Sequence, residues 1–340
     1  MNNPGQVVPK IGNALKNFLI VVGVVLSVVF LWLALKDTNF NEVRHAFSQA
    51  KLWPMVPMFL TFFGFYWLKA IRWSKLLSPS HQVSGLQLVP AMMAGAAGNN
   101  LLPAHFGELV RVYFAGKKFD IPKTTVLATL VVERLLDIVV VLFIFSIALM
   151  AGEYSSKFFG GAVFLLAAAV CIAVMSILLT LHTDKVVAFI ERRLSFLSAG
   201  LRKEVSDQIH NLTTGLMALR QRNLYVEILL NSLVQWLLMA ACLYCALLAF
   251  DIKASPMVGI VILGFTVVGL SLPTSPGFFG TIEYCYVLAL GAIGVDASTA
   301  ISAAIYYHLP AWLVVTVVGV VLLRVYHLSF SETRAEMSGV

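Results

Sequence analysis

The amino-acid sequence predicts an all-α polytopic membrane protein, and three observations lead to this fold class. Hydrophobic residues make up 59% of the 340 residues and charged residues only 12%, whereas about a quarter of the residues in a soluble domain are charged. Apolar segments are spread from residue 18 to residue 326, and several are long enough to cross a bilayer. They leave no room for a large soluble domain, so residues 1–340 are expected to form a single membrane domain.

Each long apolar run is interpreted as a span, because about 20 apolar residues cross the hydrocarbon core. The run at 18–35 is longer than the roughly 7–15 residues of a signal-peptide core, so it is interpreted as a retained anchor helix. The other expected elements are a polar amphipathic connection at 36–52, a span at 54–71, an apolar run at 86–102, a short helix at 104–116, spans at 124–150 and 161–181, a polar segment at 184–222, a span at 225–250, an apolar run at 256–272, its continuation at 276–294 and a last span at 299–325.

Two stretches combine helix-breaking residues with polar side chains inside apolar surroundings. Breaks and charges at membrane depth are tolerated where they line a cavity or are buried in protein, so we expect these stretches to form the working part. The first, 98–111, contains Asn99, Asn100, Pro103, Gly107, Glu108 and Arg111, and the second, 269–283, contains Pro273, Pro276, Gly277, Gly280 and Glu283.

Basic residues give an orientation if both broken units are re-entrant hairpins. With the N-terminus inside, 18 Lys and Arg fall in predicted inside segments and five in outside segments, while Arg134 lies within a helix. Such an excess marks the cytoplasmic side, so both termini are expected in the cytoplasm. The predicted inside segments are 1–17, 69–75, 104–123, 182–224 and 324–340.

The two broken units are then oriented oppositely. The unit at 86–116 would enter from the cytoplasm and the unit at 256–294 from outside, each between two full spans, which is the pattern of an inverted repeat. We therefore expect about six full spans plus two oppositely oriented Pro/Gly-broken re-entrant hairpins, with 54–150 as the first half and 225–326 as the second. The alternative is a pair of ordinary kinked helices without symmetry.

The segment at 184–222 has apolar residues at steps of three and four, with arginines on the other face. This periodicity predicts cytoplasmic amphipathic linker helices that lie on an anionic lipid surface. A linker between the two halves that lies on the membrane is fully compatible with this pattern and is favoured over a regulatory site.

Charged residues within the apolar segments are the main candidates for function. Glu108 and Arg111 are three apart and can pair on one helix face. Glu133 and Asp137 share a face of 124–150, and Arg134 can reach Asp137. A lone charge at a helix centre costs about 2.5–3.5 kcal/mol on insertion scales, so these charges must be compensated or hydrated. They form either a functional cavity or an ion-paired clamp, for example to Arg111.

In the second half, Glu283 follows the break and His308 precedes Pro310 in the last span. A histidine in an apolar helix is either a satisfied core residue or, opposite a broken segment, part of a site. The cysteine pair Cys242 and Cys245 is interpreted as packing. No motif for nucleotide or metal binding is present, so no cofactor and no metal are expected. The formal charge of +7 is attributed to basic cytoplasmic loops rather than to nucleic-acid binding.

Three groups of residues resemble the transmembrane region of lysylphosphatidylglycerol synthases, the lipid-flippase domain of the multiple peptide resistance factor family. Their order and spacing agree over nearly the whole chain, although His308 stands where relatives often carry Arg. The resemblance implies lipid handling by a stand-alone member without the synthase domain. The groups are Asn100-Leu-Leu-Pro103 with Gly107, Glu108 and Arg111; Glu133-Arg134 with Asp137; and Pro273, Pro276-Gly277, Gly280 and Glu283.

Together these observations predict a transporter, a flippase or scramblase, of the cell inner membrane. It would move a phospholipid or polyprenyl-phosphate glycolipid through a polar midplane cavity, either down a gradient or coupled to protons. The alternatives are a membrane-embedded transferase acting on a polyprenyl-phosphate lipid and a non-transporting scaffold. Expected partners are the membrane lipid substrate and an envelope glycosyltransferase or synthase. The predicted substrate-binding residues are Asn99, Asn100, Glu108, Arg111, Glu133, Arg134, Asp137, Glu283 and His308.

Overall fold

The computed structural model describes residues 13–102, 106–151, 154–182 and 222–328. All regular elements within these residues are helices, which confirms the predicted all-α class for this part of the chain. Pro103 and most of the predicted linker at 184–222 lie outside it. The elements are α1 (Asn13–Leu35), α2 (Phe40–Gln49), α3 (Met55–Leu77), α4 (Gly85–Leu101), α5 (Gly107–Phe119), α6 (Lys123–Met150), α7 (Ser155–Leu181), α10 (Arg222–Ala249), α11 (Met257–Leu270), the 3-10 turn η3 (Pro276–Phe278), α12 (Thr281–Gly291) and α13 (Ala297–Val325).

Length and apolar composition identify three described helices that can cross a membrane. These are Ser156–Leu178 in α7, Asn223–Ala249 in α10 and Ala297–Val325, which is α13. A fourth is added if α1 and α2, which meet at a bend of 77°, count as one span. The helices α3 and α6 are 23 and 28 residues long but carry the buried charges described below. The topology with about six spans therefore remains a prediction.

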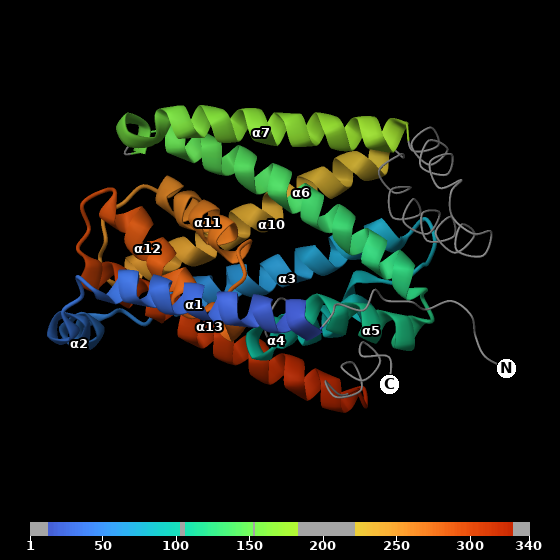
Figure 1. Ribbon diagram of the computed structural model, residues 1–340, viewed down its shortest axis with the longest axis horizontal. Coiled ribbons are helices and arrows are strands. Elements are labelled where there is room, and N and C mark those ends of the chain that lie inside the picture. The colour runs from blue at the N-terminus through green and yellow to red at the C-terminus, as the bar shows by residue number, and fades with distance from the viewer. Residues whose placement is uncertain (1–12, 103–105, 152–153, 183–221, 329–340) are drawn as a thin grey trace.

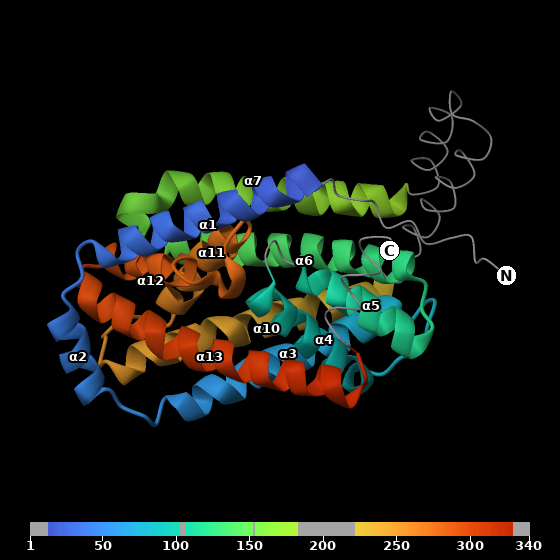
Figure 2. The same ribbon diagram turned by 60° about the horizontal axis from the view of Figure 1, so that its bottom comes forward.

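Apart from the turns within the pairs α4–α5 and α11–α12, the connections between the described helices gather at the two ends of an elongated bundle (Figures 1 and 2). At one end the backbone N–H of Asn39 donates to Ser298 Oγ (3.0 Å), and Tyr154 donates to the carbonyl of Ala289 (2.9 Å). At the other end the rings of Phe114 and Tyr326 lie 5.3 Å apart. The connections at these two ends correspond to the predicted outside segments and the predicted inside segments. Which group faces the cytoplasm remains a prediction.

Two pairs of helices enter this bundle from opposite ends and turn back near its middle (Figures 1 and 2). The pair α4–α5 is held by Asn99, whose side-chain oxygen accepts from the Gly107 N–H (2.9 Å). The pair α11–α12 is held by Cys285, whose Sγ donates to the Phe265 carbonyl (3.3 Å). Two oppositely directed re-entrant hairpins require this arrangement. Their insertion into a bilayer and the repeat halves 54–150 and 225–326 remain predictions.

Two sequence boundaries need correction. The second span was expected to end at residue 71, but α3 continues to Leu77, and Lys69 and Arg72 are buried in it. They were counted as inside-loop charges, and the ion pairs described below explain why they are buried instead. The connection at 36–52 contains the helix α2, which the N-cap Asn39 starts by accepting from the N–H of Asn41.

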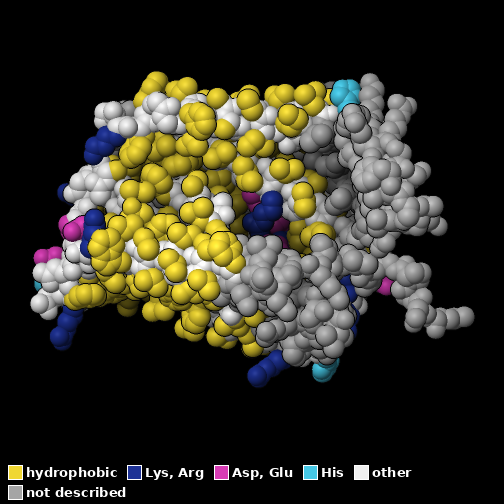
Figure 3. Space-filling view, in the orientation of Figure 1, with side chains coloured by type: hydrophobic (Ala, Val, Ile, Leu, Met, Phe, Trp, Pro, Cys, Tyr) yellow, Lys and Arg dark blue, Asp and Glu magenta, His cyan; other side chains and the backbone are white. Residues whose placement is uncertain are grey.

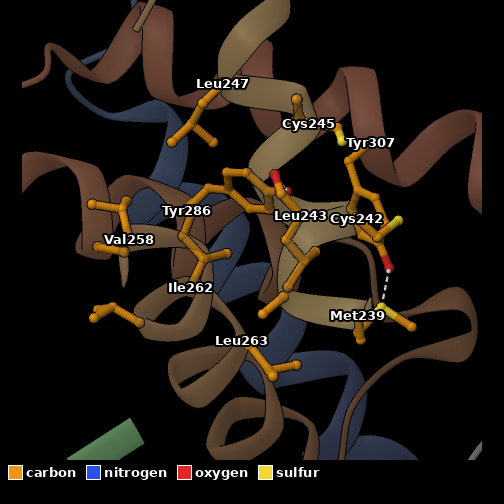
Figure 4. Packing of buried hydrophobic residues seen from close by; sticks show 14 of the residues in the cluster. Met239, Cys242, Leu243, Cys245, Leu247, Val258, Ile262, Leu263, Tyr286 and Tyr307 are labelled. Atoms are coloured by element: carbon orange, nitrogen blue, oxygen red, sulfur yellow. Dashed lines mark hydrogen bonds between the residues drawn. The ribbon is translucent and has the colours of Figure 1, made fainter. Parts of the chain in front are cut away.

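The largest apolar core takes residues from α3, α6, α10, α11, α12 and α13, and Figure 4 shows its part around α10 and α11. Tyr307 on α13 contacts Met239 on α10, with its hydroxyl 3.8 Å from the sulfur. Cys242 and Cys245 lie in the same core as buried cysteines without a disulfide. Their i,i+3 spacing therefore reflects packing in α10. This core fixes the wall of α13 that faces the cavity.

Substituting Gly107 with alanine is expected to destabilise the protein, because α4 and α5 cross there without room for a side chain. A Cβ on Gly107 would lie 1.9 Å from the Gly95 carbonyl oxygen, and overpacking of this kind costs about 1–3 kcal/mol. Thermal unfolding of the purified protein in detergent would show a lower midpoint for Gly107→Ala. The matched control is Gly160→Ala in α7, where a Cβ would meet nothing within 4 Å. An equal midpoint for both variants would contradict the close crossing.

Candidate functional site

A cavity of about 490 Å³ lies in the middle of the bundle, where the two helix pairs turn back. Its wall comes from α3, α4, α5, α6, α10, α11, α12 and α13, with η3 at one side. Figure 3 shows basic and acidic side chains in a hollow that is surrounded by apolar side chains. The cavity therefore joins a polar interior to an apolar outer surface.

Glu133 on α6 is the centre of one group of ion pairs. Its two carboxylate oxygens accept from Arg111 Nη1 and Nη2 at 3.0 and 3.1 Å, a bidentate geometry that fits a guanidinium to a carboxylate. Lys69 Nζ lies 3.2 Å and Arg72 Nη2 3.9 Å from the same carboxylate. Arg111 also stacks on the Trp73 ring at 4.3 Å. Because Glu133 is fully buried and paired with three cations, it lies behind the cavity wall.

Asp137, one turn further along α6, is the centre of a second group. Its Oδ1 accepts from Arg72 Nη1 (2.7 Å) and from Trp236 Nε1 (2.9 Å). Arg72 also donates to Ser232 Oγ (2.9 Å), and the Gln235 amide lies against both Arg72 and Asp137. These contacts join α3 and α6 to α10. They show how a fully buried arginine is compensated inside an apolar bundle.

Glu108 and Arg134 form the rim of the cavity. Glu108 pairs with Arg111 at 3.1 Å, as their spacing predicts, and with Arg134 on its other oxygen. The Arg134 side chain is 48% exposed. It lies on the same face of α6 as Val131 and Ile138, which are 50% and 38% exposed. An arginine thus stands on an apolar outer face, where the cavity opens sideways.

The two groups and the rim form one network with an excess of positive charge. Arg134 Nη1 lies 4.0 Å from Asp137 Oδ2, the i,i+3 contact expected from the sequence, and Lys69 Nζ lies 3.9 Å from the same oxygen. Four cations face three carboxylates, so the described network carries one net positive charge. The cations are Lys69, Arg72, Arg111 and Arg134, and the acids are Glu108, Glu133 and Asp137.

The two asparagines of the first broken stretch join the helix ends to their neighbours. Asn99 bridges to Gly107 across the break. Asn100 Nδ2 donates to the Trp312 carbonyl (3.2 Å) and to Thr316 Oγ1 (2.9 Å), both on α13. Both asparagines also line the cavity. They therefore hold the tip of α4 against α13 and leave part of their surface to the cavity.

Glu283 and His308 close the opposite side of the cavity. His308 Nδ1 lies 2.6 Å from Glu283 Oε1, and Nε2 lies 2.8 Å from the Gly277 carbonyl oxygen. Glu283 Oε2 accepts from the Gly280 N–H at 2.6 Å. The glycines are required, because Gly277 and Gly280 have φ of 74° and 86°. The pair thus fastens the turn at 276–280 to α13, and of the two only His308 lines the cavity.

The hydrogen bonds of this pair fix its proton count. A carbonyl oxygen only accepts, so the hydrogen bond to Gly277 requires a hydrogen on His308 Nε2. A second hydrogen must lie between Nδ1 and the Glu283 carboxylate, on either atom. The pair as a whole is then neutral, and the net positive charge of the cavity comes from the arginine and lysine network.

Replacing Glu283 with alanine or glutamine is expected to have unequal effects. The alanine leaves the Gly280 N–H and His308 Nδ1 without their partner, and each buried unsatisfied group costs about 1–3 kcal/mol. The glutamine keeps an oxygen for the Gly280 N–H and an N–H for His308, so its loss is expected to be about that of one hydrogen bond, 0.5–1.5 kcal/mol. Thermal unfolding in detergent measures both. Equal losses in the two variants would show that the fastening of the turn does not stabilise the protein.

The structure thus brings the nine predicted site residues to one cavity and its supporting shell. Sequence reasoning missed the contributions of α3 and α10. A signal existed for α3, because Phe62, Phe65, Lys69 and Arg72 recur at steps of three and four on one helix face. No described His, Cys, Asp or Glu residues form a group that could hold a metal ion. The missed residues are Lys69, Arg72, Trp73, Ser232, Gln235 and Trp236.

The helical bundle and its laterally open charged cavity define a membrane protein with a site for polar groups at the centre of an apolar surface. The sequence model of the protein family 'lysylphosphatidylglycerol synthase TM region' matches residues 20–319. The chain therefore belongs to this family, as the resemblance of its three groups of motif residues predicted.

One curated relative of the chain is named as an enzyme. Glycosyltransferase AglD of Haloferax volcanii is 24% identical over 323 residues, which cover 85% of this chain and 51% of the relative. The chain thus spans about half the length of the curated relative it matches. No solved structure matches the chain.

Proposed function

We propose that the protein moves an anionic membrane lipid between leaflets, with the headgroup inside the cavity and the tails outside in lipid. The observation that carries this proposal is the net positive network behind a lateral opening in an apolar surface. Arg134 and Lys69 contribute basic groups to the cavity wall, and a phosphate ester is the anionic group common to membrane lipids. Guanidinium and ammonium groups both bind phosphate oxygens.

The cavity would lower the free energy barrier to crossing, because a charged headgroup in hydrocarbon loses its hydration without compensation. Inside the cavity the lost contacts with water would be replaced by the basic side chains and by the asparagines. The opening beside the apolar outer face of α6 would let the tails stay in lipid. A transporter of this kind needs no catalytic residue.

A transferase acting on a lipid phosphate is the second candidate, because the curated relative is named a glycosyltransferase. The acid groups would then have to act as general base and acid. The two candidates differ in product: a transporter changes the leaflet of its lipid and a transferase changes the lipid chemically. Mass spectrometry of lipids recovered after incubation with purified protein and a nucleotide sugar distinguishes them.

The transport proposal is tested in phosphatidylcholine vesicles that contain fluorescent phosphatidylglycerol and the purified protein. A membrane-impermeant reductant bleaches only the outer leaflet, so bleaching beyond half of the label reports translocation. The protein should carry label to the outer leaflet, and vesicles without protein should not. Translocation equal in the two preparations would overturn the proposal.

Arg134→Gln is expected to slow translocation of phosphatidylglycerol by about tenfold or more, since each 1.4 kcal/mol of lost interaction is a factor of ten. The substitution removes the exposed cation of the network. Lys253→Gln removes the same charge from an exposed position in the connection before α11 and should leave the rate unchanged. Equal rates for both variants would exclude Arg134 from the transport path.

A further inference from the structure

We infer that the Glu283–His308 pair is a proton site. Its single shared proton keeps the turn at 276–280 fastened to α13, and loss of this proton opens the cavity on that side. For its effect on transport the inference rests on the proposed function. The fastening of the turn is a property of the fold alone and can be measured without lipid.

Glu283 differs from other acids of the cavity in the base that it contacts. Glu108 and Asp137 each contact arginine, and an arginine does not lose its proton in proteins. Among the described ion pairs, the base beside Glu283 is His308, and histidine is the side chain that gains and loses a proton near neutral pH. The pair at the turn can therefore change its proton count while the arginine pairs keep theirs.

A neutral imidazole has one hydrogen and cannot serve both contacts of His308. Its Nε2 lies 2.8 Å from the Gly277 carbonyl oxygen, and its Nδ1 lies 2.6 Å from Glu283 Oε1. A carbonyl and an ionised carboxylate both only accept. With the shared proton present, each contact contains a hydrogen. Without it, one of the two contacts places a nitrogen lone pair against an oxygen lone pair. Loss of one proton thus breaks one of the two links between α13 and the segment 277–283.

The turn itself is strained and borders the cavity. Phe278 lines the cavity and has φ of 63°, a left-handed conformation that a bulky residue keeps only where its surroundings enforce it. On its other side the turn is held by α1, because α12 lies between α1 and α13 (Figure 2) and the Ser275 N–H donates to Ser27 Oγ (2.8 Å). A turn released from α13 therefore stays attached to α1 and no longer closes the cavity.

Other titratable side chains near the pair direct their hydrogens elsewhere. Cys285 and Tyr286 on α12 donate to backbone carbonyls of α11 and α10, and the Tyr307 hydroxyl contacts the sulfur of Met239. The helices α4 and α11, the turn η3 and the described side chains of α1 contain no titratable group. The cysteines of α10 lie in the apolar core. Across the cavity, the charged groups of the wall are Lys69, Glu108, Arg111, Arg134 and Asp137.

Glu283→Gln tests the proton site, because glutamine can keep each hydrogen bond of the pair without a proton that titrates. Its amide oxygen accepts from the Gly280 N–H, its amide N–H donates to the imidazole Nδ1, and Nε2–H still donates to Gly277. The turn should then stay fastened at every pH. The matched control is Glu227→Gln, which makes the same chemical change in the exposed ion pair with Lys75.

Hydrogen exchange with mass spectrometry measures opening of the turn in the purified protein without lipid transport. The N–H groups of Gly280 and Tyr284 are hydrogen-bonded in this segment, so they exchange when it opens. The exchange rate of the unmodified protein divided by that of Glu283→Gln at the same pH cancels the intrinsic effect of pH. We expect this ratio to rise by up to about tenfold per pH unit, because opening releases one proton. Glu227→Gln should exchange like the unmodified protein. A ratio that is constant or falls with pH would overturn the inference.

The fluorescence assay in vesicles measures the effect on transport at the same pH values. The rate of phosphatidylglycerol crossing in the unmodified protein, divided by the rate in Glu283→Gln, should rise with pH in parallel with the exchange ratio. A rising exchange ratio without lipid crossing at any pH supports the proton site and overturns only the proposed function. Lipid crossing with a ratio that does not change with pH supports the proposed function and overturns the inference.

Discussion

Replacing Glu133 with alanine is expected to destabilise the protein so strongly that little folded protein is found in the membrane fraction. The carboxylate accepts two hydrogen bonds from Arg111 and lies beside Lys69 and Arg72, so its loss leaves three buried cations with too little compensation. Breaking a buried ion pair by removing one partner costs about 3–5 kcal/mol, a large share of the stability of most proteins. Yield in the membrane and thermal unfolding in detergent both measure this loss.

A matched control is available at the end of the bundle. Glu227 pairs with Lys75, and their side chains are 57% and 31% exposed. Glu227→Ala should cost no more than about 1 kcal/mol, as exposed ion pairs do. The double variant Glu133→Leu with Arg111→Met removes both members of the buried pair and should recover part of the lost stability. If Glu133→Ala unfolds at the same temperature as Glu227→Ala, the buried network does not stabilise the fold.

Filling the cavity is expected to abolish lipid translocation while the protein stays folded. Ala96 on α4 lines the cavity and is only partly buried, so Ala96→Trp would place an indole ring in a space of about 490 Å³. The ring would occupy the position of a headgroup and leave the ion pairs of α6 in place. The fluorescence assay in vesicles measures the rate, and the unfolding temperature shows whether the fold is retained.

The control for this variant is Val174→Trp on α7. Val174 is 49% exposed and none of the described α7 side chains lines the cavity, so the same bulk is added outside the proposed path. Its rate should equal that of the unmodified protein. Normal translocation by a folded Ala96→Trp variant would mean that lipids do not pass through this cavity.

Local contacts of the site could be predicted from the sequence, whereas contacts between distant segments could not. The pairing of Glu108 with Arg111 and the approach of Arg134 to Asp137 follow from a spacing of three residues on a helix, and both are observed. The suggestion that the α6 acids clamp Arg111 also agrees with the structure for Glu133. It rested on the need to compensate buried charge, which limits the partners to a few.

The charges of α3 could not be placed in the same way. Lys69 and Arg72 follow an apolar run, and basic residues in that position commonly mark a cytoplasmic boundary. They are instead held within the bundle by Glu133 and Asp137, more than 60 residues away in the chain. The contact of Arg72 with Ser232 spans 160 residues. Helical periodicity contains no information about which helices become neighbours, so the network required three-dimensional placement.

The broken helices have a further electrostatic consequence. A helix that begins inside a protein presents the positive end of its macrodipole there, and such ends commonly attract anions. Here α5 and α12 both begin near the middle of the bundle, and each carries an acid in its own first turn, Glu108 and Glu283. Both helix starts thus oppose their dipole with a carboxylate of their own. The proposed preference of the cavity for an anion would then depend on side chains, so it could be altered one residue at a time without changing the backbone.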